Sequence, residues 1–480
     1  MWSYWPFNDG LRDAITGAGL NWQAIENIMR PPSPAVRSPQ IRGECPAGLR
    51  KYLDGEYRAA ETSFQGLRAG RLAFPDPWGG PTPLAATGCG LRNVTKSELY
   101  GNPLIYRCKS EERLFYAVSY NLTGRITQLI FPQLQVIIFD IFQSNAELMA
   151  TLFEANREQI DALMERRQLD CHRVVGVIDM VFNYGHHMMN HLSGLERLVS
   201  TGLHDSLNEV WVSGIPFFGE IAEIFPEIAR KLRLFSNQGA MLDAILAENV
   251  LPLRVGSNVF SHGLRQRLLD AASRRIVYPA DNRRFPLVAV TIRGGGRACL
   301  NLGEVVAHLH RMLSPHFPNI GYVLDGWVFP EALLRLSSGA ATCLWPDNLA
   351  LISREMAAAG EVADALPRGA VVRNLIGQSI LHSISGLRDI DAYFAHVGTL
   401  QHKLGFLTHA RGFVHGPKRQ MTHFDAGTFA TESGLTPKFV DPACVVDVDG
   451  SGGIRGEGFA NYRISDLDNA LKPMLQMLKW

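Results

Sequence analysis

The sequence has little net charge and few cysteines. Its 480 residues include 47 basic and 46 acidic side chains, which give a formal net charge of +1. This balance argues against a chain-wide attraction to nucleic acid, and we expect no nucleic-acid partner. The seven cysteines are scattered, odd in number, and form no C-x-x-C pair. Their spacing disfavours both a disulfide framework and a zinc site, and it is typical of a reducing compartment.

Long apolar runs and an export signal are also missing. The longest charge-free apolar stretch, 126–139, is shorter than the ~20 residues that a membrane helix needs, and it contains Pro132. The first ten residues contain neither the basic region nor the apolar region of a signal peptide. We therefore expect a cytoplasmic protein without a transmembrane segment.

Several catalytic motifs are absent as well. The chain contains no G-x-S-x-G sequence, which disfavours a serine hydrolase. Its glycine-bearing turns match neither the Walker P-loop nor the G-x-G-x-x-G dinucleotide fingerprint. Phosphate-binding sites must therefore be sought in other strand-to-helix turns.

The order of apolar segments predicts an α/β protein with more than one domain. A single core rarely grows beyond about 250–300 residues. Residues 1–170 are interpreted as an irregular extension with a β hairpin and helices, among them helices near 21–29 and 49–66. Strands and helices then alternate in 171–280 and again in 281–464, which predicts two Rossmann-like lobes with parallel sheets. Ligands of such sheets bind at the carboxyl ends of the strands, so we expect a site in a central cleft between the lobes.

Three histidines follow a predicted strand of the first lobe: His186, His187 and His191. Histidine titrates near neutral pH, so this cluster is a candidate for a general base with positioned neighbours. The alternative is that Asn183 and His186 cap the helix and the other histidines fill its surface. A metal site is a third interpretation, but the glutamate of the zincin motif is missing between His187 and His191.

The second lobe has two glycine turns between a strand and a helix. In 291–297, Arg293 and Arg297 flank three glycines, a pattern that suits phosphate binding; the alternative is a flexible turn with solvated arginines. In 396–403, a glycine-threonine turn opens a helix and predicts a second anion site, with a threonine cap and an exposed lysine as the alternative. Asp325 ends a strand and either accepts hydrogen bonds from a sugar or forms a turn. The remaining candidate binding residues are His396, Gly398, Thr399, Gln401 and Lys403.

These motifs, in this order, resemble GT-B glycosyltransferases, most nearly glycosyltransferase family 61. The Asn-Tyr-x-His motif of that family is matched by 183–186, and its spaced arginines followed by Asn and an acidic residue are matched by 292–304. Its late glycine motif has a loose counterpart in 396–399, where heptosyltransferases of family 9 also use a glycine turn. The resemblance implies the GT-B fold, with two lobes and a C-terminal helix, 465–480, that braces the first lobe.

The resemblance also implies a function. The second lobe would bind a nucleotide-sugar donor, and the first lobe would bind an acceptor hydroxyl on a glycan, a lipid-linked glycan or a protein. Transfer would be inverting and metal-independent, with His186 as the base and with Arg293, Arg297 and Lys403 stabilising the departing diphosphate. No cofactor is expected beside the donor. A nucleotide-sugar hydrolase or epimerase of the same fold, and a two-lobed small-molecule-binding protein, are the alternatives.

Overall fold

The computed structural model divides the chain into two compact units, which are described one at a time. Unit 1 holds the described residues up to Ile215 and Ile221–Phe260, and unit 2 holds Pro216–Glu220 and those from Ser261 onward. The described residues are 2–30, 69–91, 102–110, 113–120, 122–140, 143–167, 173–179, 183–257, 259–276, 278–279, 284–335, 346–423, 437–448 and 460–478. The helix expected near 49–66 lies outside them.

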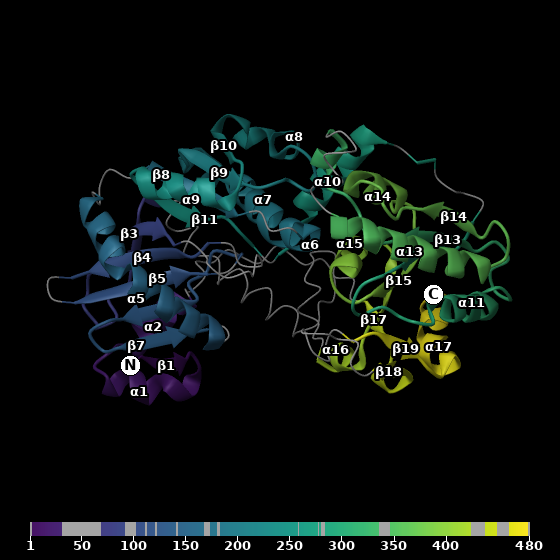
Figure 1. Cartoon of the computed structure of the whole chain (residues 1–480), viewed down its shortest axis with the longest axis horizontal. Helices are drawn as coiled ribbons and strands as arrows, with labels where there is room; N and C mark the ends of the chain where they lie inside the picture. The colour runs from purple at the N-terminus through teal and green to yellow at the C-terminus, as the bar shows by residue number, and fades with distance from the viewer. Residues whose placement is uncertain are drawn as a thin grey trace. The chain divides into compact units, whose positions relative to one another are not determined.

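Unit 1 contains a seven-stranded sheet where an irregular extension with a β hairpin and helices was expected (Figure 1). The strands are β1 (Ser3–Pro6), β2 (Leu72–Phe74), β3 (Leu84–Gly90), β4 (Leu104–Lys109), β5 (Leu114–Ser119), β6 (Gln128–Phe131) and β7 (Val136–Phe139). Their order is β1-β7-β6-β5-β4-β3-β2, and β1 pairs in parallel with β7 while the other pairs are antiparallel. The apolar face of α5 (Gln143–Arg166) packs on this sheet, together with the short α1 (Arg12–Gly17) and α2 (Trp22–Met29) nearby. Because turn residues separate such short strands, the sheet was not evident from the sequence.

A parallel sheet completes unit 1. Its strands are β8 (Arg173–Asp179), β9 (Glu209–Ser213), β10 (Leu232–Phe235) and β11 (Val250–Arg254), in the order β10-β9-β8-β11. The connecting segments are α6 (Tyr184–His186), the π-helical η2 (His187–Leu192), α7 (Ser193–Ser200), η3 (Leu203–Ser206), α8 (Ile221–Ile224), η4 (Pro226–Lys231) and α9 (Gln238–Ala247). Central strands of a parallel sheet are buried on both faces, which explains the apolar runs of β8 and β9.

Unit 2 is built on a six-stranded parallel sheet. Its strands are β12 (Leu287–Thr291), β13 (Gly321–Asp325), β14 (Val371–Asn374), β15 (Ala392–His396), β16 (Arg411–His415) and β17 (Lys438–Phe439). The order β14-β13-β12-β15-β16-β17 reverses direction between β12 and β15. In open α/β sheets such a switch point is where ligands bind.

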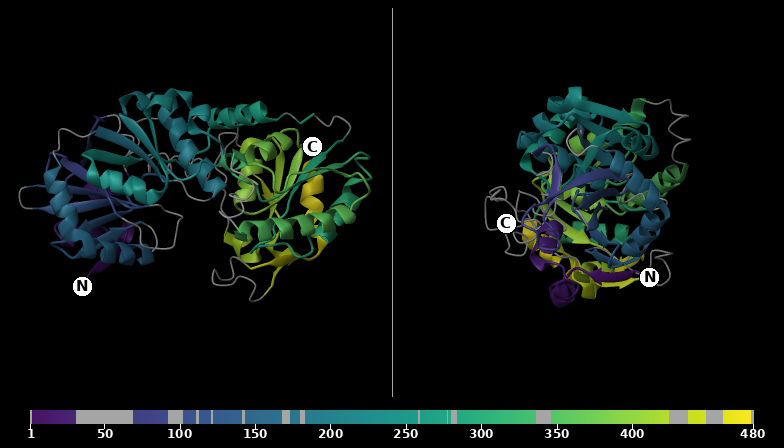
Figure 2. Two further views of the ribbon diagram at one scale, coloured as in Figure 1. Left: turned by 45° about the horizontal axis from the view of Figure 1, so that its top comes forward. Right: turned by 90° about the vertical axis from the view of Figure 1, so that its left-hand side faces the viewer.

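Helices cover both faces of this sheet (Figures 1 and 2). Val288 and Val290 face a core shared with α11 (Leu302–Leu313) and α13 (Pro346–Asp364). Leu287 and Ala289 face a second core on the other side, with α15 (Thr399–Leu407). The other elements are α10 (His262–Arg275), η5 (Glu331–Arg335), α14 (Ile380–Gly386), α16 (Lys418–His423), η7 (Pro442–Cys444), and the antiparallel pair β18 (Val445–Asp447) and β19 (Tyr462–Ile464). The prediction of an α/β fold with parallel sheets is confirmed.

Two expectations about boundaries differ from the structure. The division lies at Ser261, before α10, where the sequence suggested a break near 280. The last helix, α17 (Leu467–Leu478), was expected to brace the first lobe, but its apolar residues pack into the core of unit 2 itself. Arg411 Nη1 donates a hydrogen bond of 2.5 Å to the carbonyl of Met477 near the end of the helix. The prediction of a C-terminal helix with an apolar face is therefore confirmed, but the prediction that it packs against the first lobe is wrong.

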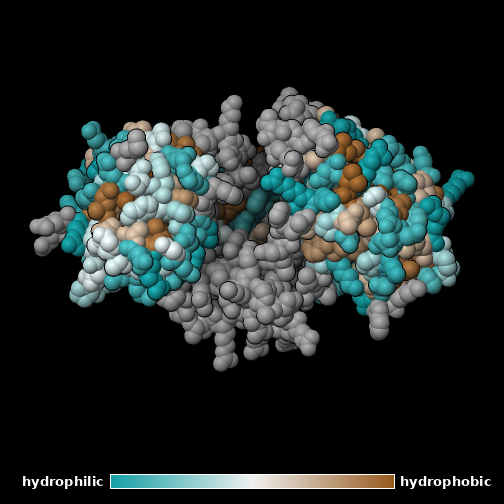
Figure 3. All heavy atoms as spheres, turned by 90° about the horizontal axis from the view of Figure 1, so that it is seen from below, coloured by the Kyte–Doolittle hydropathy of each residue, from teal (hydrophilic) through white to brown (hydrophobic). Residues whose placement is uncertain are grey.

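No helix in the described parts of the chain is both long enough and apolar enough to cross a membrane. On the face shown in Figure 3, hydrophilic side chains cover most of the described surface, and apolar ones form small separated patches. Scattered exposed apolar residues of this kind are normal on folded proteins.

Candidate functional site

The switch point of unit 2 is held together by Thr291 and His396, the last residues of β12 and β15. Thr291 Oγ1 lies 2.9 Å from His396 Nδ1 and accepts a 2.7 Å hydrogen bond from the His396 backbone N–H. The Cys299 N–H donates to His396 Nε2 at 3.4 Å. Burial, reinforced by His415 and the nearby arginines, lowers the pKa of His396 well below 6.5. Both ring nitrogens of this neutral histidine are engaged within the protein, so His396 ties the strands together instead of facing a ligand.

The first glycine turn leads out of β12 and is bound to α13. Glu355 accepts hydrogen bonds from the Gly294 N–H at 3.1 Å and, through its other oxygen, from the Trp327 N–H at 2.6 Å. Arg293 Nε donates to the Gly296 carbonyl at 2.6 Å. Burial raises the pKa of Glu355, and these two N–H groups and Arg293 oppose the shift. Because a carboxylate already occupies the Gly294 amide, this amide is not the phosphate cradle that the sequence suggested.

Arg297, at the end of the same turn, reaches the second glycine turn. Its Nη1 lies 3.3 Å from the position that a Cβ would take on Gly398, and it donates to Gln420 Oε1 at 3.5 Å. Arg297 has a φ of +68°, a left-handed conformation that costs free energy in a residue with a side chain. Gly398, with a φ of +107°, precedes the first residue of α15, Thr399. The structure thus brings together three predicted site residues, which we call the Arg297 cluster: Arg297, Gly398 and Thr399.

Lys403 does not belong to this cluster. Its ammonium is fully buried and donates to Asp325 Oδ1 at 2.6 Å and to Ser383 Oγ at 2.7 Å. Ser383 Oγ in turn donates to Asp325 Oδ1 at 2.9 Å. Burial lowers the pKa of Lys403, and Asp325 opposes the shift. The expected contacts of Lys403 with a diphosphate and of Asp325 with a sugar are replaced by this internal ion pair.

Gln401 also points into the protein, since it is 1% exposed and its Nε2 donates to Tyr393 Oη at 3.3 Å. Sequence reasoning missed Ser383 and Glu355, which engage predicted site residues. Neither lies in a motif, and both come from helices distant in sequence, so no local signal could have found them.

The three predicted catalytic histidines of unit 1 separate into a buried pair and a single half-buried ring. Asn183 Oδ1 caps the helix start by accepting from the N–H groups of Gly185 at 2.9 Å and His186 at 3.3 Å. His187 and His191 are each 1% exposed, with their Nδ1 atoms 3.4 Å apart. Burial lowers the pKa of His187 to about 3, and that of His191 well below 6.5. These two rings face each other and not His186.

His186 is half-buried, and its Nδ1 lies 3.0 Å from Oδ1 of Asn190, four residues later. Asn190 lies within the histidine-rich segment, but the sequence did not indicate it as a site residue. Of the three predicted catalytic histidines, only His186 is not buried. No group of three or more His, Cys, Asp or Glu side chains among the described residues is arranged to hold a metal ion.

The parallel sheet of unit 1 carries a buried ion pair at its own strand ends. Nη1 of Arg254, the last residue of β11, lies 3.2 Å from Oδ2 of Asp179, the last residue of β8. Each of these side chains is 1% exposed. Ser213, at the end of β9, donates to Asp179 Oδ1 at 3.4 Å. In both parallel sheets, a polar side-chain pair therefore joins the ends of the first and fourth strands in chain order.

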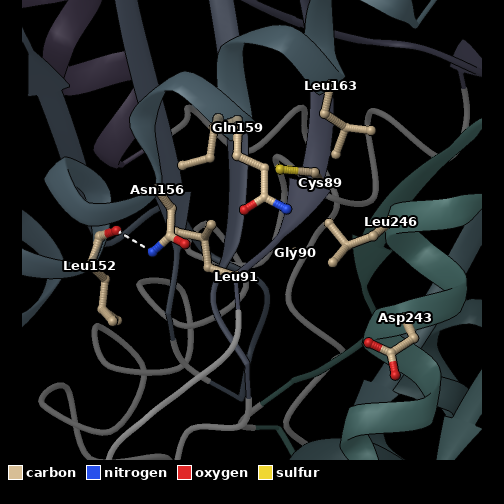
Figure 4. Close-up of a pocket in the computed structure, with 10 residues that line it drawn as sticks. Cys89, Gly90, Leu91, Leu152, Asn156, Gln159, Leu163, Asp243 and Leu246 are labelled. Atoms are coloured by element: carbon tan, nitrogen blue, oxygen red, sulfur yellow. Dashed lines mark hydrogen bonds between the residues drawn. The ribbon is translucent and has the colours of Figure 1, made fainter.

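Unit 1 also has a cavity of about 420 Å³ between α5, α9 and the end of β3 (Figure 4). Cys89 and Ile160 are among its buried apolar lining residues, and burial raises the pKa of the Cys89 thiol to about 12. Asn156, Gln159 and Asp243 contribute the polar part of the wall, with Asn156 Nδ2 donating to the Leu152 carbonyl at 2.8 Å. No sequence motif marked this cavity.

Comparisons with known proteins identify no family. No family model matches the chain, and no curated protein matches it. Among solved structures, it is similar to one described as accessory secretory protein 1, 2 and 3 in Streptococcus pneumoniae, with 9% identity and a TM-score of 0.19. The match covers 65% of this chain and 54% of that one, so the chain spans about half the length of its match. A likeness of this size carries no argument about fold or activity.

Proposed function

We propose that this protein is a glycosyltransferase that binds a nucleotide-sugar through the Arg297 cluster of unit 2. The observation that carries the proposal is the position of the Arg297 guanidinium against Gly398, at the start of α15 and beside the switch point of the sheet. The N-terminus of a helix presents unpaired N–H groups and a positive dipole, and a guanidinium pairs well with phosphate oxygens. Together they suit the diphosphate of a nucleotide-sugar.

In this reaction the acceptor hydroxyl attacks the anomeric carbon of the donor sugar. The new carbon–oxygen bond forms as the bond between that carbon and the diphosphate oxygen breaks, and the diphosphate leaves with the electron pair. His186 of unit 1 takes the acceptor proton, and the configuration at the anomeric carbon inverts. Arg297 and the N–H groups at the start of α15 stabilise the growing charge of the diphosphate, so no metal is required.

Lys403 and Asp325 have a supporting role in this proposal. Their ion pair joins the end of β13 to α15, and Ser383 links it to α14. This arrangement holds the first turn of α15, and with it Gly398 and Thr399, at the edge of the sheet. A rigid support of this kind is what a preorganised anion site requires.

Calorimetric titration with nucleoside diphosphates tests the donor site. Arg297→Ala should weaken binding about 10- to 100-fold, since hydrogen bonds to charged groups contribute about 1.5–3 kcal/mol. Arg388→Ala is the matched control, because Arg388 is an exposed arginine of unit 2 that precedes the amino end of β15. The donor site is refuted if the wild-type protein binds no nucleoside diphosphate, or if the two variants bind equally well.

Turnover tests the reaction itself. His186→Ala should lower transfer by roughly 10²–10⁴ while leaving donor affinity unchanged. Products are compared with and without a hydroxyl acceptor. Release of free sugar at the same rate in both conditions would identify a hydrolase. Nucleotide binding without formation of any product would indicate a binding protein that has no transferase activity.

A further inference from the structure

We infer that Asn190 is a positioning residue that holds His186 in the tautomer protonated on Nδ1, so that Nε2 carries the lone pair that accepts a proton. The role of Nε2 as a base rests on the proposed function, whereas the tautomer itself does not. The inference stands on a chain of hydrogen bonds that runs from a backbone carbonyl through the Asn190 amide to the imidazole ring.

The chain begins at the Ser257 carbonyl, just beyond β11. Asn190 Nδ2 donates to this carbonyl at 3.2 Å, and the Ser257 N–H donates to the Asn190 carbonyl at 2.9 Å. Asn190 is 3% exposed. A carbonyl oxygen only accepts hydrogen bonds, so the edge of the amide that faces Ser257 must be its NH₂ group. The orientation of the Asn190 side chain is therefore fixed by the backbone.

The other edge of the amide faces His186. It presents Oδ1, which only accepts hydrogen bonds, at 3.0 Å from His186 Nδ1. Nδ1 must therefore carry the proton, and in the neutral ring this leaves Nε2 unprotonated. Neutral histidine in water favours the opposite tautomer, so the protein selects the less common form. The hydrogen bond at one ring nitrogen in this way determines the chemistry of the other.

The loop that bears Ser257 has little freedom to move. A Cβ on Gly256 would lie 1.9 Å from the Leu122 carbonyl oxygen, and one on Gly194 would lie 2.5 Å from Gly256 Cα. The backbones of α7, this loop and the segment at Leu122 are thus in direct contact. Such close packing keeps the Ser257 carbonyl in place and, through Asn190, keeps the His186 ring in one orientation.

During transfer, the acceptor proton moves to His186 Nε2 as the new glycosidic bond forms and the diphosphate leaves. The ring then carries a proton on each nitrogen, and Asn190 Oδ1 still accepts from Nδ1–H. Asn190 touches neither substrate in this step. It acts by keeping the basic nitrogen free before the step and by maintaining its hydrogen bond after it.

Nitrogen-15 NMR of the full chain labelled on histidine tests the tautomer directly. The wild-type His186 ring should show Nδ1–H and a bare Nε2, with its signals assigned by their loss in His186→Gln. Asn190→Ala should convert His186 to the Nε2–H form. Asn183→Ala is the matched control, because it removes an amide from the same helix start without touching the ring; exposed His316 is the internal reference.

The outcomes separate this inference from the proposed function. A wild-type His186 ring in the Nε2–H form, or an Nδ1–H form that persists in Asn190→Ala, would overturn the inference even if transfer is observed. If Asn190→Ala does not fold, the tautomer of His186 in the wild-type spectrum alone tests the inference. The expected tautomers without any glycosyl transfer would support the inference and reject only the proposed function. Where transfer is measurable, Asn190→Ala should lower kcat at least 10-fold and leave the donor KM unchanged.

Discussion

Acidification should destabilise both units through four buried histidines: His187 and His191 in unit 1, and His396 and His415 in unit 2. Burial lowers the pKa of His187 and of His415 to about 3 and the pKa values of the other two well below 6.5. In the unfolded chain, each returns to about 6.5. Because the folded-state pKa is the lower one, the stability linked to each ring is fully present above about pH 6.5 and is lost as the pH falls toward 3.

The size of the effect follows from proton linkage. Consider one histidine that stays neutral in the folded state and has a pKa of about 6.5 in the unfolded state. When the pH falls from 7.5 to 5.5, its linkage lowers the unfolding free energy by about 1.4 kcal/mol. Two such histidines therefore lower the unfolding free energy of each unit by about 3 kcal/mol. A typical domain has only about 5–15 kcal/mol in total. Mild acid alone should therefore take a large part of the stability of each unit.

Urea unfolding of the full chain across this pH range provides the assay, with each transition evaluated separately if the units unfold apart. His415→Gln and His187→Gln should each reduce the pH dependence of the unfolding free energy by about one proton below pH 6. The variants lose stability at every pH, so only the slope is compared. His316→Gln, at an exposed position, should leave the slope unchanged. Equal slopes for all three variants would refute the reasoning.

Two further predictions concern unit 2. Lys403→Met leaves the buried Asp325 carboxylate without its cation and should cost about 3–5 kcal/mol in urea unfolding, whereas adding Asp325→Leu should restore much of the loss. A double variant no more stable than the single one would contradict the ion pair. Gly398→Ala should cost about 1–3 kcal/mol because of its positive φ, and it should also weaken nucleoside diphosphate binding in calorimetry. Gly369→Ala also places a side chain at a positive φ, in an exposed turn, and should leave affinity intact; an equal loss of affinity in both variants would count against the site.

The chemistry of the proposed base depends on a residue that contacts no substrate. His186 was identified from its place after a strand, but its tautomer is set by Asn190 and by the backbone behind it. Variants of Asn190 are thus expected to resemble variants of His186 in turnover while leaving the donor site of unit 2 intact. The same variants distinguish a positioned base from a histidine that merely caps the helix.

The sequence by itself determined most of the local structure from residue 172 onward. The alternation predicted for 171–280 corresponds to β8, β9, β10, α9, β11 and α10, and that predicted for 281–464 includes β12, α11, β13 and β15. Asn183 caps the helix of His186, as the alternative interpretation of the histidine cluster proposed. These features depend on periodicity and on capping within a few residues, and such information is present in the local sequence. In the first 140 residues, the expected β hairpin corresponds to β5, β6 and β7, but the remaining strands of the sheet were missed because they are short and carry no local pattern that marks their partners.

Only the tertiary structure decided which candidate residues meet. Lys403 and Asp325 were both expected to face a ligand, and they face each other because a buried ammonium and a buried carboxylate each need a partner. Arg297 meets Gly398 because the crossover between β12 and β15 brings two distant turns to one edge of the sheet. Strand order places these side chains, and the desolvation of charge then selects their partners. Neither the strand order nor the desolvation of these charges is encoded within a local stretch of sequence. The glycine motifs therefore located the two turns, and the fold determined which of their residues remain available to a ligand.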